Sequence, residues 1–293
     1  MSSPLSIIFC GTPAFAIPSL KALLERQQDV KISLIITQPD QPVGRKQVLT
    51  PPPAKVFAQS HRLPCLQPEN INDDATRTAI QESHCDMLIT VAYGQLLSPA
   101  LLAIPKLGAV NVHPSLLPRW RGASPIQNAI LAGDTETGVT VQQMVETLDA
   151  GPILAQQRVA LPPDETAEHL SEVLAEIGGE LLADTITKPL APVAQDESQV
   201  TLCRKLSRKD GEVNPSEMTA EEIHRRVRAL HPWPGVAAPF GGTRVKILKT
   251  SLVAEPEALE IPCKDGNTLY VLSLQPPGRK PMSGKAWLRG HTK

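Results

Sequence analysis

Three polar residues near the middle of the sequence have the types and the spacing that acyl chemistry needs. Asn111 and His113 lie two residues apart at the end of an apolar run, and Asp149 follows 36 positions after the histidine. Residues two apart on a strand point to one face of a sheet, so the amide and the imidazole would project together. An amide can stabilise an oxyanion, an imidazole can move a proton near neutral pH, and a carboxylate can orient that imidazole. These residues form the candidate catalytic set.

Asn111 and His113 could instead be two polar side chains that cap a strand and have no catalytic role. The surrounding sequence helps to choose between these two interpretations. Residues 111–118 read NVHPSLLP, and an RG pair at 121–122, TGVT over 137–140 and DAG over 149–151 follow. These residues resemble the core of the folate-dependent formyltransferases, in which N-x-H-x-S-L-L-P, R-G, P, T-G-x-T and D-x-G occur in this order. The resemblance implies a Rossmann-like formyltransferase domain, and it favours catalysis over strand capping.

The same resemblance implies a mechanism and a co-substrate. Asn111 would donate a hydrogen bond to the formyl oxygen, His113 would stabilise that oxygen or pass a proton to the folate leaving group, and Asp149 would hold the imidazole charged. The formyl donor would be 10-formyltetrahydrofolate, and no metal is expected. The folate would be bound by Ser115, Leu116, Leu117 and Pro118 and by the backbone around Val91, Tyr93 and Gly94.

The order of elements along the chain predicts an α/β fold. Apolar runs typical of strands occur at residues 5–10, 30–37, 87–92 and 109–113. A helix is expected over 18–26, and strands that alternate with helices indicate a parallel sheet with ligands beyond the carboxyl ends of its strands. The loops after those ends are Gly11-Thr12-Pro13, 38–40, Tyr93-Gly94 and His113-Pro114. Their convergence itself indicates a site.

Gly11, Thr12 and Pro13 lack the G-x-G-x-x-G spacing of a dinucleotide site, which disfavours a nicotinamide or flavin cofactor. A plain tight turn is the alternative. A similar G-T-P occurs in the methionyl-tRNA branch of the formyltransferases, near where the acceptor end of the tRNA would lie. The resemblance therefore implies that these three residues contact tRNA.

The proline-rich segment 38–55 cannot be a regular helix or a central strand, because its five prolines remove backbone donors and fix φ. We expect a surface loop, in which Gly44, Arg45 and Lys46 provide flexibility and charge for closing on a phosphate backbone. The methionyl-tRNA branch has a similar P-D-x-P-x-G-R insertion that reaches the acceptor stem. Arg45 and Lys46 are therefore candidate tRNA contacts.

Composition indicates a globular protein without a membrane partner. The chain has 293 residues, of which 41% are hydrophobic, and its mean hydropathy is −0.11. Its first residues have no basic leader region, and the apolar run after them is too short to span a bilayer, so we expect a cytoplasmic protein. Five scattered cysteines, none spaced C-x-x-C, indicate reduced thiols rather than disulfides or a zinc site. We expect a monomer.

The net charge of −1 hides a division along the chain. Residues 200–293 hold 16 Lys and Arg against 9 Asp and Glu, which gives +7, whereas residues 1–199 hold 13 against 21, which gives −8. A basic C-terminal third can attract a polyanion, although such a surplus is often only a solvated surface. Lys209 and Arg244 are candidate tRNA contacts in this part.

Residues 188–205 are predicted to link a catalytic domain, 1–187, to a C-terminal domain, 206–293. The stretch 188–200 is proline-bearing and poorly periodic, as in a semi-rigid spacer. Beyond it, a helix over 219–230 and alternating strands over 244–248 and 268–274 predict a small antiparallel barrel of OB type. We expect Trp233, between two prolines, to pack inside this domain rather than to stack on a base.

The last residues are the most specific part of the resemblance. LSLQPPGRKPMSG, from residue 272, resembles the end of the methionyl-tRNA formyltransferases, and Gln143 resembles their glutamine where the glycinamide ribonucleotide branch has histidine. The implied acceptor is the methionine amino group of initiator methionyl-tRNA. Two alternatives stay open: a formyltransferase acting on a small amine, and an RNA-binding protein without activity. This chain departs from the family in two places. It has Val213-Asn214-Pro215 where the family usually has I-D-W or a similar triplet, and its barrel is shorter by about one hairpin between residues 251 and 269.

Overall fold

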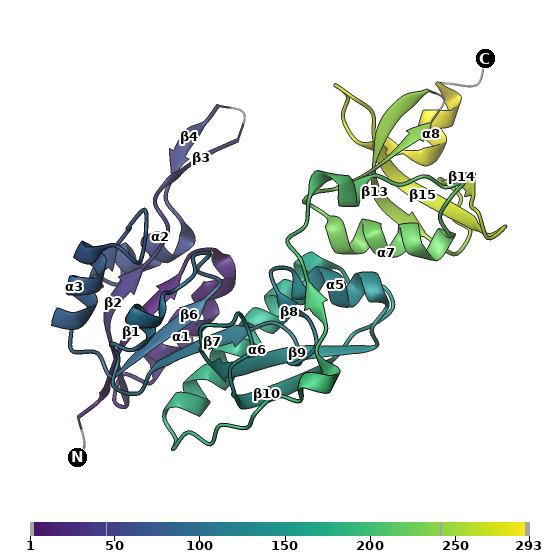
Figure 1. Cartoon of the computed structure of the whole chain (residues 1–293). Coiled ribbons are helices and arrows are strands. Elements are labelled where there is room, and N and C mark those ends of the chain that lie inside the picture. The colour runs from purple at the N-terminus through teal and green to yellow at the C-terminus, as the bar shows by residue number, and fades with distance from the viewer. Residues whose placement is uncertain (1–2, 45, 241, 291–293) are drawn as a thin grey trace. The chain divides into compact units, whose positions relative to one another are not determined.

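The computed structural model describes residues 3–44, 46–240 and 242–290. The chain divides into two compact units, each built from several segments (Figure 1). The first unit comprises Met1–Gly122, Thr137–Val159 and Ser171–Leu202, and the second comprises Ala123–Glu136, Ala160–Leu170 and Cys203–Lys293. Among the described residues, no helix combines the length and the apolar character needed to cross a membrane.

The first unit is built on a seven-stranded sheet in the order β10-β9-β7-β6-β1-β2-β5. Its strands are β1 (Leu5–Gly11), β2 (Val30–Ile36), β5 (Cys65–Leu66), β6 (Met87–Val91), β7 (Ala109–His113), β9 (Glu136–Gln143) and β10 (Ile153–Ala160). The central strands pair in parallel and β9 pairs with β7 antiparallel. Every residue of β6 is buried, as expected for a parallel strand covered on both faces. The mostly parallel sheet confirms the predicted α/β class.

Helices connect the strands of this sheet or follow its last strand. They are η1 (Ala14–Ala16), α1 (Ile17–Glu25), α2 (Pro53–Ser60), α3 (Asp74–Glu82), α4 (Pro99–Leu102), α6 (Ala167–Ile186) and η2 (Glu197–Gln199). Asp73 begins α3 with a side-chain cap, since its carboxylate accepts from Thr76 N at 2.6 Å. In α6, Gly178 and Gly179 allow close packing, because a Cβ on Gly179 would lie 2.8 Å from the carbonyl carbon of Pro18 in α1.

The proline-rich segment is more regular than we expected. It forms a separate two-stranded antiparallel hairpin of β3 (Gln41–Val43) and β4 (Val48–Thr50), and its last residues already belong to α2. The expectation of a loop without helix was therefore wrong at residues 53–55. Prolines are compatible with both elements, because Pro42 lies in a hairpin without a central strand, and Pro53 takes the first helical position, where no backbone donor is needed.

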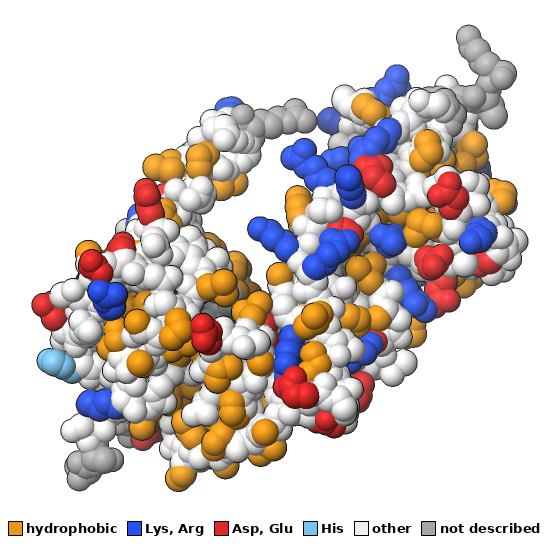
Figure 2. Space-filling view, viewed as in Figure 1, with side chains coloured by type: hydrophobic (Ala, Val, Ile, Leu, Met, Phe, Trp, Pro, Cys, Tyr) orange, Lys and Arg blue, Asp and Glu red, His pale blue; other side chains and the backbone are white. Residues whose placement is uncertain are grey.

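The second unit carries an antiparallel sheet in the order β12-β13-β15-β14, with β16 paired to β15. Its elements are α5 (Pro125–Ala132), η3 (Arg208–Gly211), α7 (Ala220–Leu230), β12 (Val236–Phe240), β13 (Thr243–Ser251), β14 (Leu259–Pro262), β15 (Thr268–Gln275), β16 (Met282–Ser283) and α8 (Gly284–Arg289). Thr219 and Glu222 form the capping box that begins α7. The antiparallel strands confirm the predicted C-terminal fold, and Figure 2 shows Lys and Arg side chains, mixed with Asp and Glu, on the visible face of this part of the chain.

Two segments differ from simple expectation. Trp233 is 53% exposed, so the prediction that it packs inside the C-terminal domain was wrong. The stretch 188–202 belongs to the first unit and makes specific contacts: Val193 exchanges backbone hydrogen bonds with Ile153 at 2.8 Å, and β11 (Leu202–Cys203) pairs with β8 (Arg121–Gly122). A polar, proline-bearing sequence does not reveal such contacts, because its partners are distant in the chain.

The close packing of α6 against α1 predicts the effect of one substitution. Gly179→Val is expected to lower the free energy of unfolding by about 1–3 kcal/mol, because the added atoms would meet rigid backbone of Pro18 and Ser19. Chemical denaturation measures the change. Glu176→Val, on the exposed side of the same helix, is the matched control and should stay within about 0.5 kcal/mol. Equal stability of the two variants would contradict the close approach.

Candidate active site

Strand β7 places the two central candidates on one face of the sheet. It lies between β6 and β9, where Asn111 is opposite Thr90 on one side and Gln142 on the other, and His113 is opposite Thr140. The alternation of a strand directs Asn111 and His113 to the same side. Both residues lie at the carboxyl end of β7, where sheets of this kind bind ligands.

The amide of Asn111 is oriented by a neighbouring strand. Thr90 Oγ1 donates to Asn111 Oδ1 at 2.8 Å, and Asn111 is only partly buried. An amide oxygen that accepts from a hydroxyl leaves the NH2 group as the donor toward a ligand. This is the arrangement that stabilisation of an oxyanion requires.

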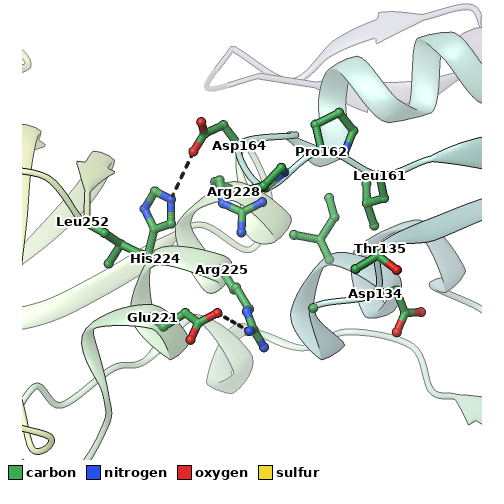
Figure 3. Close-up of a pocket in the computed structure, with 13 residues that line it drawn as sticks. Asp134, Thr135, Leu161, Pro162, Asp164, Glu221, His224, Arg225, Arg228 and Leu252 are labelled. Carbon is green, nitrogen blue, oxygen red and sulfur yellow. Dashed lines mark hydrogen bonds and ion pairs between the residues drawn. The ribbon is translucent and has the colours of Figure 1, made fainter.

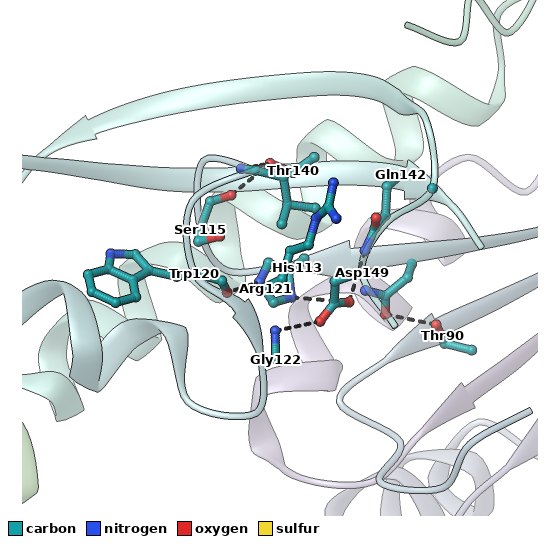
Figure 4. A network of polar contacts seen from close by, with 12 residues as sticks. Thr90, His113, Ser115, Trp120, Arg121, Gly122, Thr140, Gln142 and Asp149 are labelled. Atoms are coloured by element: carbon teal, nitrogen blue, oxygen red, sulfur yellow. Dashed lines mark hydrogen bonds and ion pairs between the residues drawn. The ribbon is translucent and has the colours of Figure 1, made fainter. Parts of the chain in front are cut away.

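The imidazole of His113 is buried, and both of its nitrogens face oxygen acceptors. Nε2 lies 2.9 Å from the carbonyl oxygen of Trp120, and Nδ1 lies 3.6 Å from Asp149 Oδ1 (Figure 4). A ring with a proton on each nitrogen could donate toward both oxygens, whereas a neutral ring could donate to one only. Trp120 has a φ of 63°, a conformation uncommon for a bulky residue, so its carbonyl is held there by the surrounding structure.

The carboxylate of Asp149 is oriented by two donors. Oδ2 accepts from the backbone N–H of Gly122 at 2.9 Å, and Oδ1 accepts from Gln142 Nε2 at 3.0 Å. The side chain is 8% exposed, and the residue has a φ of 55°. These contacts fix the carboxylate beside His113, so the two candidates of β7 and the one from the turn between β9 and β10 meet in one place.

The loop after β7 is fixed by side chains of β9 and β10. Ser115 is fully buried, and its hydroxyl donates to Arg119 O at 2.6 Å. Thr140 Oγ1 donates to Ser115 O at 2.7 Å and accepts from Leu117 N at 3.1 Å. Leu117 is buried as well, whereas Leu116 and Pro118 are partly exposed. Ser115 and Leu117 therefore hold the loop, and Leu116 and Pro118 present surface.

The carboxyl ends of β1 and β6 also meet. Thr12 Oγ1 donates to the carbonyl oxygen of Tyr93 at 2.9 Å, and Gln38 Nε2 reaches the same oxygen at 3.2 Å. Val91 and Gly11 are buried, whereas Gly94 is exposed with a φ of 93°. The Tyr93 hydroxyl is buried without a hydrogen-bond partner among the described residues, and burial raises the pKa of this phenol. The loop convergence predicted from the sequence is thus present at these strands.

Two domain families, both of formyl transferases, match this chain. Residues 5–186 match the family described as formyl transferase, and residues 205–292 match the formyl transferase C-terminal domain. The chain belongs to the formyl transferase family. A protein of Halalkalibacterium halodurans named methionyl-tRNA formyltransferase is 40% identical over 98% of this chain and 95% of its own.

Solved structures match this formyltransferase in fold. An N-formyltransferase from Helicobacter canadensis, in complex with folinic acid and dTDP-3-aminofucose, matches with a TM-score of 0.67 and 17% identity over 91% of this chain and 98% of its own. HypX from Aquifex aeolicus, in complex with tetrahydrofolic acid, matches with a TM-score of 0.63 and 17% identity over 98% of this chain. The chain spans about half the length of HypX, 47%.

The candidate tRNA contacts are distributed over both units of this formyltransferase. Pro13 and Lys46 are exposed in the first unit, and Lys209 is exposed in η3 of the second. Arg244 in β13 is exposed too, and its guanidinium pairs with Glu212. Arg45 lies outside the described residues.

The pocket of about 260 Å³ in Figure 3 lies entirely within the second unit. Its charged lining is mixed, because Arg225 pairs with Glu221, and His224 lies 3.9 Å from Asp164. None of the candidate catalytic residues lines it. Among the described residues, no group of three His, Cys, Asp or Glu side chains could hold a metal ion.

Sequence reasoning missed the residues that orient the site, above all Thr90, Gln142 and the amide of Gly122. A lone threonine in the apolar run of β6 is a weak signal, since threonine is common in strands. Gln142 precedes the glutamine that we singled out, Gln143, and only the register of β9 shows which of the two reaches Asp149.

The contact between Thr90 and Asn111 predicts a measurable loss of rate. Thr90→Val keeps the shape of the side chain but leaves Asn111 Oδ1 without its donor, so the amide loses its fixed orientation. We expect kcat for formyl transfer to fall by about tenfold, the equivalent of one hydrogen bond of roughly 1.4 kcal/mol. Thr78→Val, whose hydroxyl donates to Asp74 O on the surface of α3, is the control. Equal rates for both variants would refute the role of Thr90.

Proposed function

We propose that this formyltransferase transfers a formyl group from 10-formyltetrahydrofolate to the amino group of methionine on initiator methionyl-tRNA, and so supports translation initiation. One observation carries the proposal: the Halalkalibacterium halodurans protein named methionyl-tRNA formyltransferase is 40% identical over almost all of both chains. This identity covers both the catalytic sheet and the antiparallel domain. A basic domain can attract a polyanion such as tRNA, whereas a small amine would gain nothing from that attraction.

A tetrahydrofolate-type donor is supported by relatives and fits residues of this chain. Folinic acid and tetrahydrofolic acid are named in the complexes of the two structural neighbours. In this chain, Ala92 and Gly94 are exposed, and the residue between them, Tyr93, packs in a buried apolar cluster with Leu97. A fixed backbone with exposed polar groups suits the polar edge of a flat heterocycle. We infer that Val91, Tyr93 and Gly94 hold the pterin by their backbone, and that Ser115, Leu116, Leu117 and Pro118 form the adjacent loop.

The three central residues would share the chemistry. When bound, 10-formyltetrahydrofolate supplies the formyl carbon that the methionine amine attacks. Asn111 donates from its NH2 group toward the formyl oxygen as that oxygen gains negative charge. His113 stabilises the same charge or passes a proton to the leaving nitrogen, and Asp149 keeps the ring oriented and accepts protons through water. Because the neutral amine is a competent nucleophile, the enzyme contributes orientation and charge stabilisation rather than a covalent intermediate.

The tRNA would be bound by both parts of the chain. We infer contacts of its acceptor end with Gly11, Thr12 and Pro13 and with Arg45 and Lys46 of the proline-rich segment, and contacts of its phosphates with Lys209 and Arg244. In this proposal, residues 1–187 form the catalytic domain, 188–205 the linker and 206–293 the OB-like tRNA-binding domain. The protein acts as a cytoplasmic monomer.

Removal of the catalytic side chains should abolish most activity without unfolding the protein. His113→Ala and Asn111→Ala are each expected to lower kcat for formylation of methionyl-tRNA by about 10²–10³-fold, the usual cost of losing one group that stabilises an oxyanion. Circular dichroism checks folding, and Asn128→Ala, on α5 outside this network, is the control. Normal turnover of the His113 variant would end the mechanism.

Specificity and salt dependence test the acceptor. The protein should formylate initiator methionyl-tRNA faster than elongator methionyl-tRNA, and binding should weaken steeply between about 50 and 200 mM salt, because phosphate contacts release counterions. Titration of tRNA at several salt concentrations gives the slope. Faster formylation of a small amine such as an amino sugar, with tRNA inert, would replace this proposal with a small-amine formyltransferase.

A further inference from the structure

The stretch that connects the two sheets along the chain contributes a side chain to the network behind Asp149. Gln195, just before η2, donates from Nε2 to two backbone carbonyls: Asp149 O at 2.8 Å and Gly151 O at 2.7 Å. The same nitrogen also lies 3.4 Å from Gln142 Oε1, a longer contact. Because a primary amide nitrogen carries two hydrogens, the two short bonds to the carbonyls use its full donor capacity. Gln195 therefore bridges both ends of the turn that carries the catalytic carboxylate.

The other half of the same amide is anchored from β8. Arg121 Nε donates to Gln195 Oε1 at 2.9 Å, and the remaining guanidinium nitrogens pair with Glu197 at 2.7 and 3.2 Å. Arg121 is only 7% exposed. Because a guanidinium can donate but not accept, it must face the amide oxygen, and the NH2 group is directed to the carbonyls. The orientation of Gln195 is thus determined by its partners.

The turn that Gln195 bridges contains a backbone conformation that is unfavourable without surrounding contacts. Asp149 has a φ of 55°, in the left-handed region that residues other than glycine seldom adopt. Such conformations persist only where the surroundings hold them. On the other side of the turn, a Cβ on Gly151 would lie 1.8 Å from Gln143 O, so the backbone there runs directly against the end of β9. The turn lies between β9 and the Gln195 amide.

We propose that Gln195 is a positioning residue for formyl transfer. It holds the backbone of Asp149, so that the carboxylate keeps its bonds to Gly122 N and Gln142 Nε2 and its place beside His113. Gln195 acts through Asp149 and touches no substrate. The inference rests on the proposed function for its activity readout, and a second readout below is independent of that function.

Kinetics of matched linker variants test the role. In Gln195→Leu, kcat should fall by about 10- to 100-fold, as expected when a catalytic group is displaced, whereas KM for tRNA and folate should change less than about twofold. The control is Gln199→Leu, a glutamine of the same stretch whose amide donates to Asp196 Oδ2 at 2.8 Å. A structural role alone would move the melting temperature or KM and leave kcat unchanged, and that result would overturn the proposal.

A double substitution tests whether Gln195 works through the carboxylate. In an Asp149→Asn background, Gln195→Leu should cause no further loss of kcat, because the group that it positions has already been removed. Losses that multiply would show that Gln195 acts independently of Asp149 and would refute the inference. If Gln195→Leu does not fold, Gln195→Glu takes its place, since it keeps the shape and the contact with Arg121 but, as a carboxylate, donates to neither carbonyl.

Hydrogen exchange separates this inference from the proposed function. The Gly122 amide, which donates to Asp149 Oδ2, should exchange at least about tenfold faster in the Gln195 variant than in wild type or in Gln199→Leu. If wild type fails to formylate methionyl-tRNA but the exchange differs, the proposed function fails and the bracing of Asp149 stands. Unchanged exchange in a folded Gln195 variant would overturn the bracing.

Discussion

The register of β7 between β6 and β9 is the constraint on which the candidate site depends. At one level across the three strands lie Thr90, Asn111 and Gln142, and each of the outer two orients a candidate catalytic group. Two residues further, Thr140 lies opposite His113 and holds the loop that follows β7. A shift by one residue would turn every one of these side chains to the other face, so the site exists only in this register.

Among the described residues other than glycine, three of the six with a positive φ lie in loops at the candidate site. Ala92, Trp120 and Asp149 all have positive φ values without being glycine, and they follow or face the ends of β6, β7 and β9. Such conformations cost of order 1–3 kcal/mol each and are kept only by surrounding contacts. Here those contacts serve the site as well, because the carbonyl of Trp120 holds His113 and the carboxylate of Asp149 receives two donors. The hydrogen bonds that keep these backbone conformations therefore also hold the side chains of the site in place.

The sequence predicted what depends on local pattern and missed what depends on pairing. The five apolar residues of β7 and the N-x-H spacing were sufficient for the shared face of Asn111 and His113, because alternation is a local property. The hairpin at β3 and β4 and the exposure of Trp233 were not predicted, since proline content excludes central strands without defining an edge. Thr90 and Gln195 were missed because their partners lie 21 and 46 positions away, and no spacing rule reaches across those distances.

Because charge is unevenly distributed along the chain, its two parts would act on a polyanion over different distances. The first 199 residues carry −8 and the last 94 carry +7, so a polyanion would be repelled by one part and attracted by the other. Screening limits such attraction to about 10 Å at 0.1 M salt, which is long enough to guide an encounter but not to orient one amine. Orientation must then come from short contacts at the strand ends, such as those that the Asn111 amide and the His113 imidazole can make.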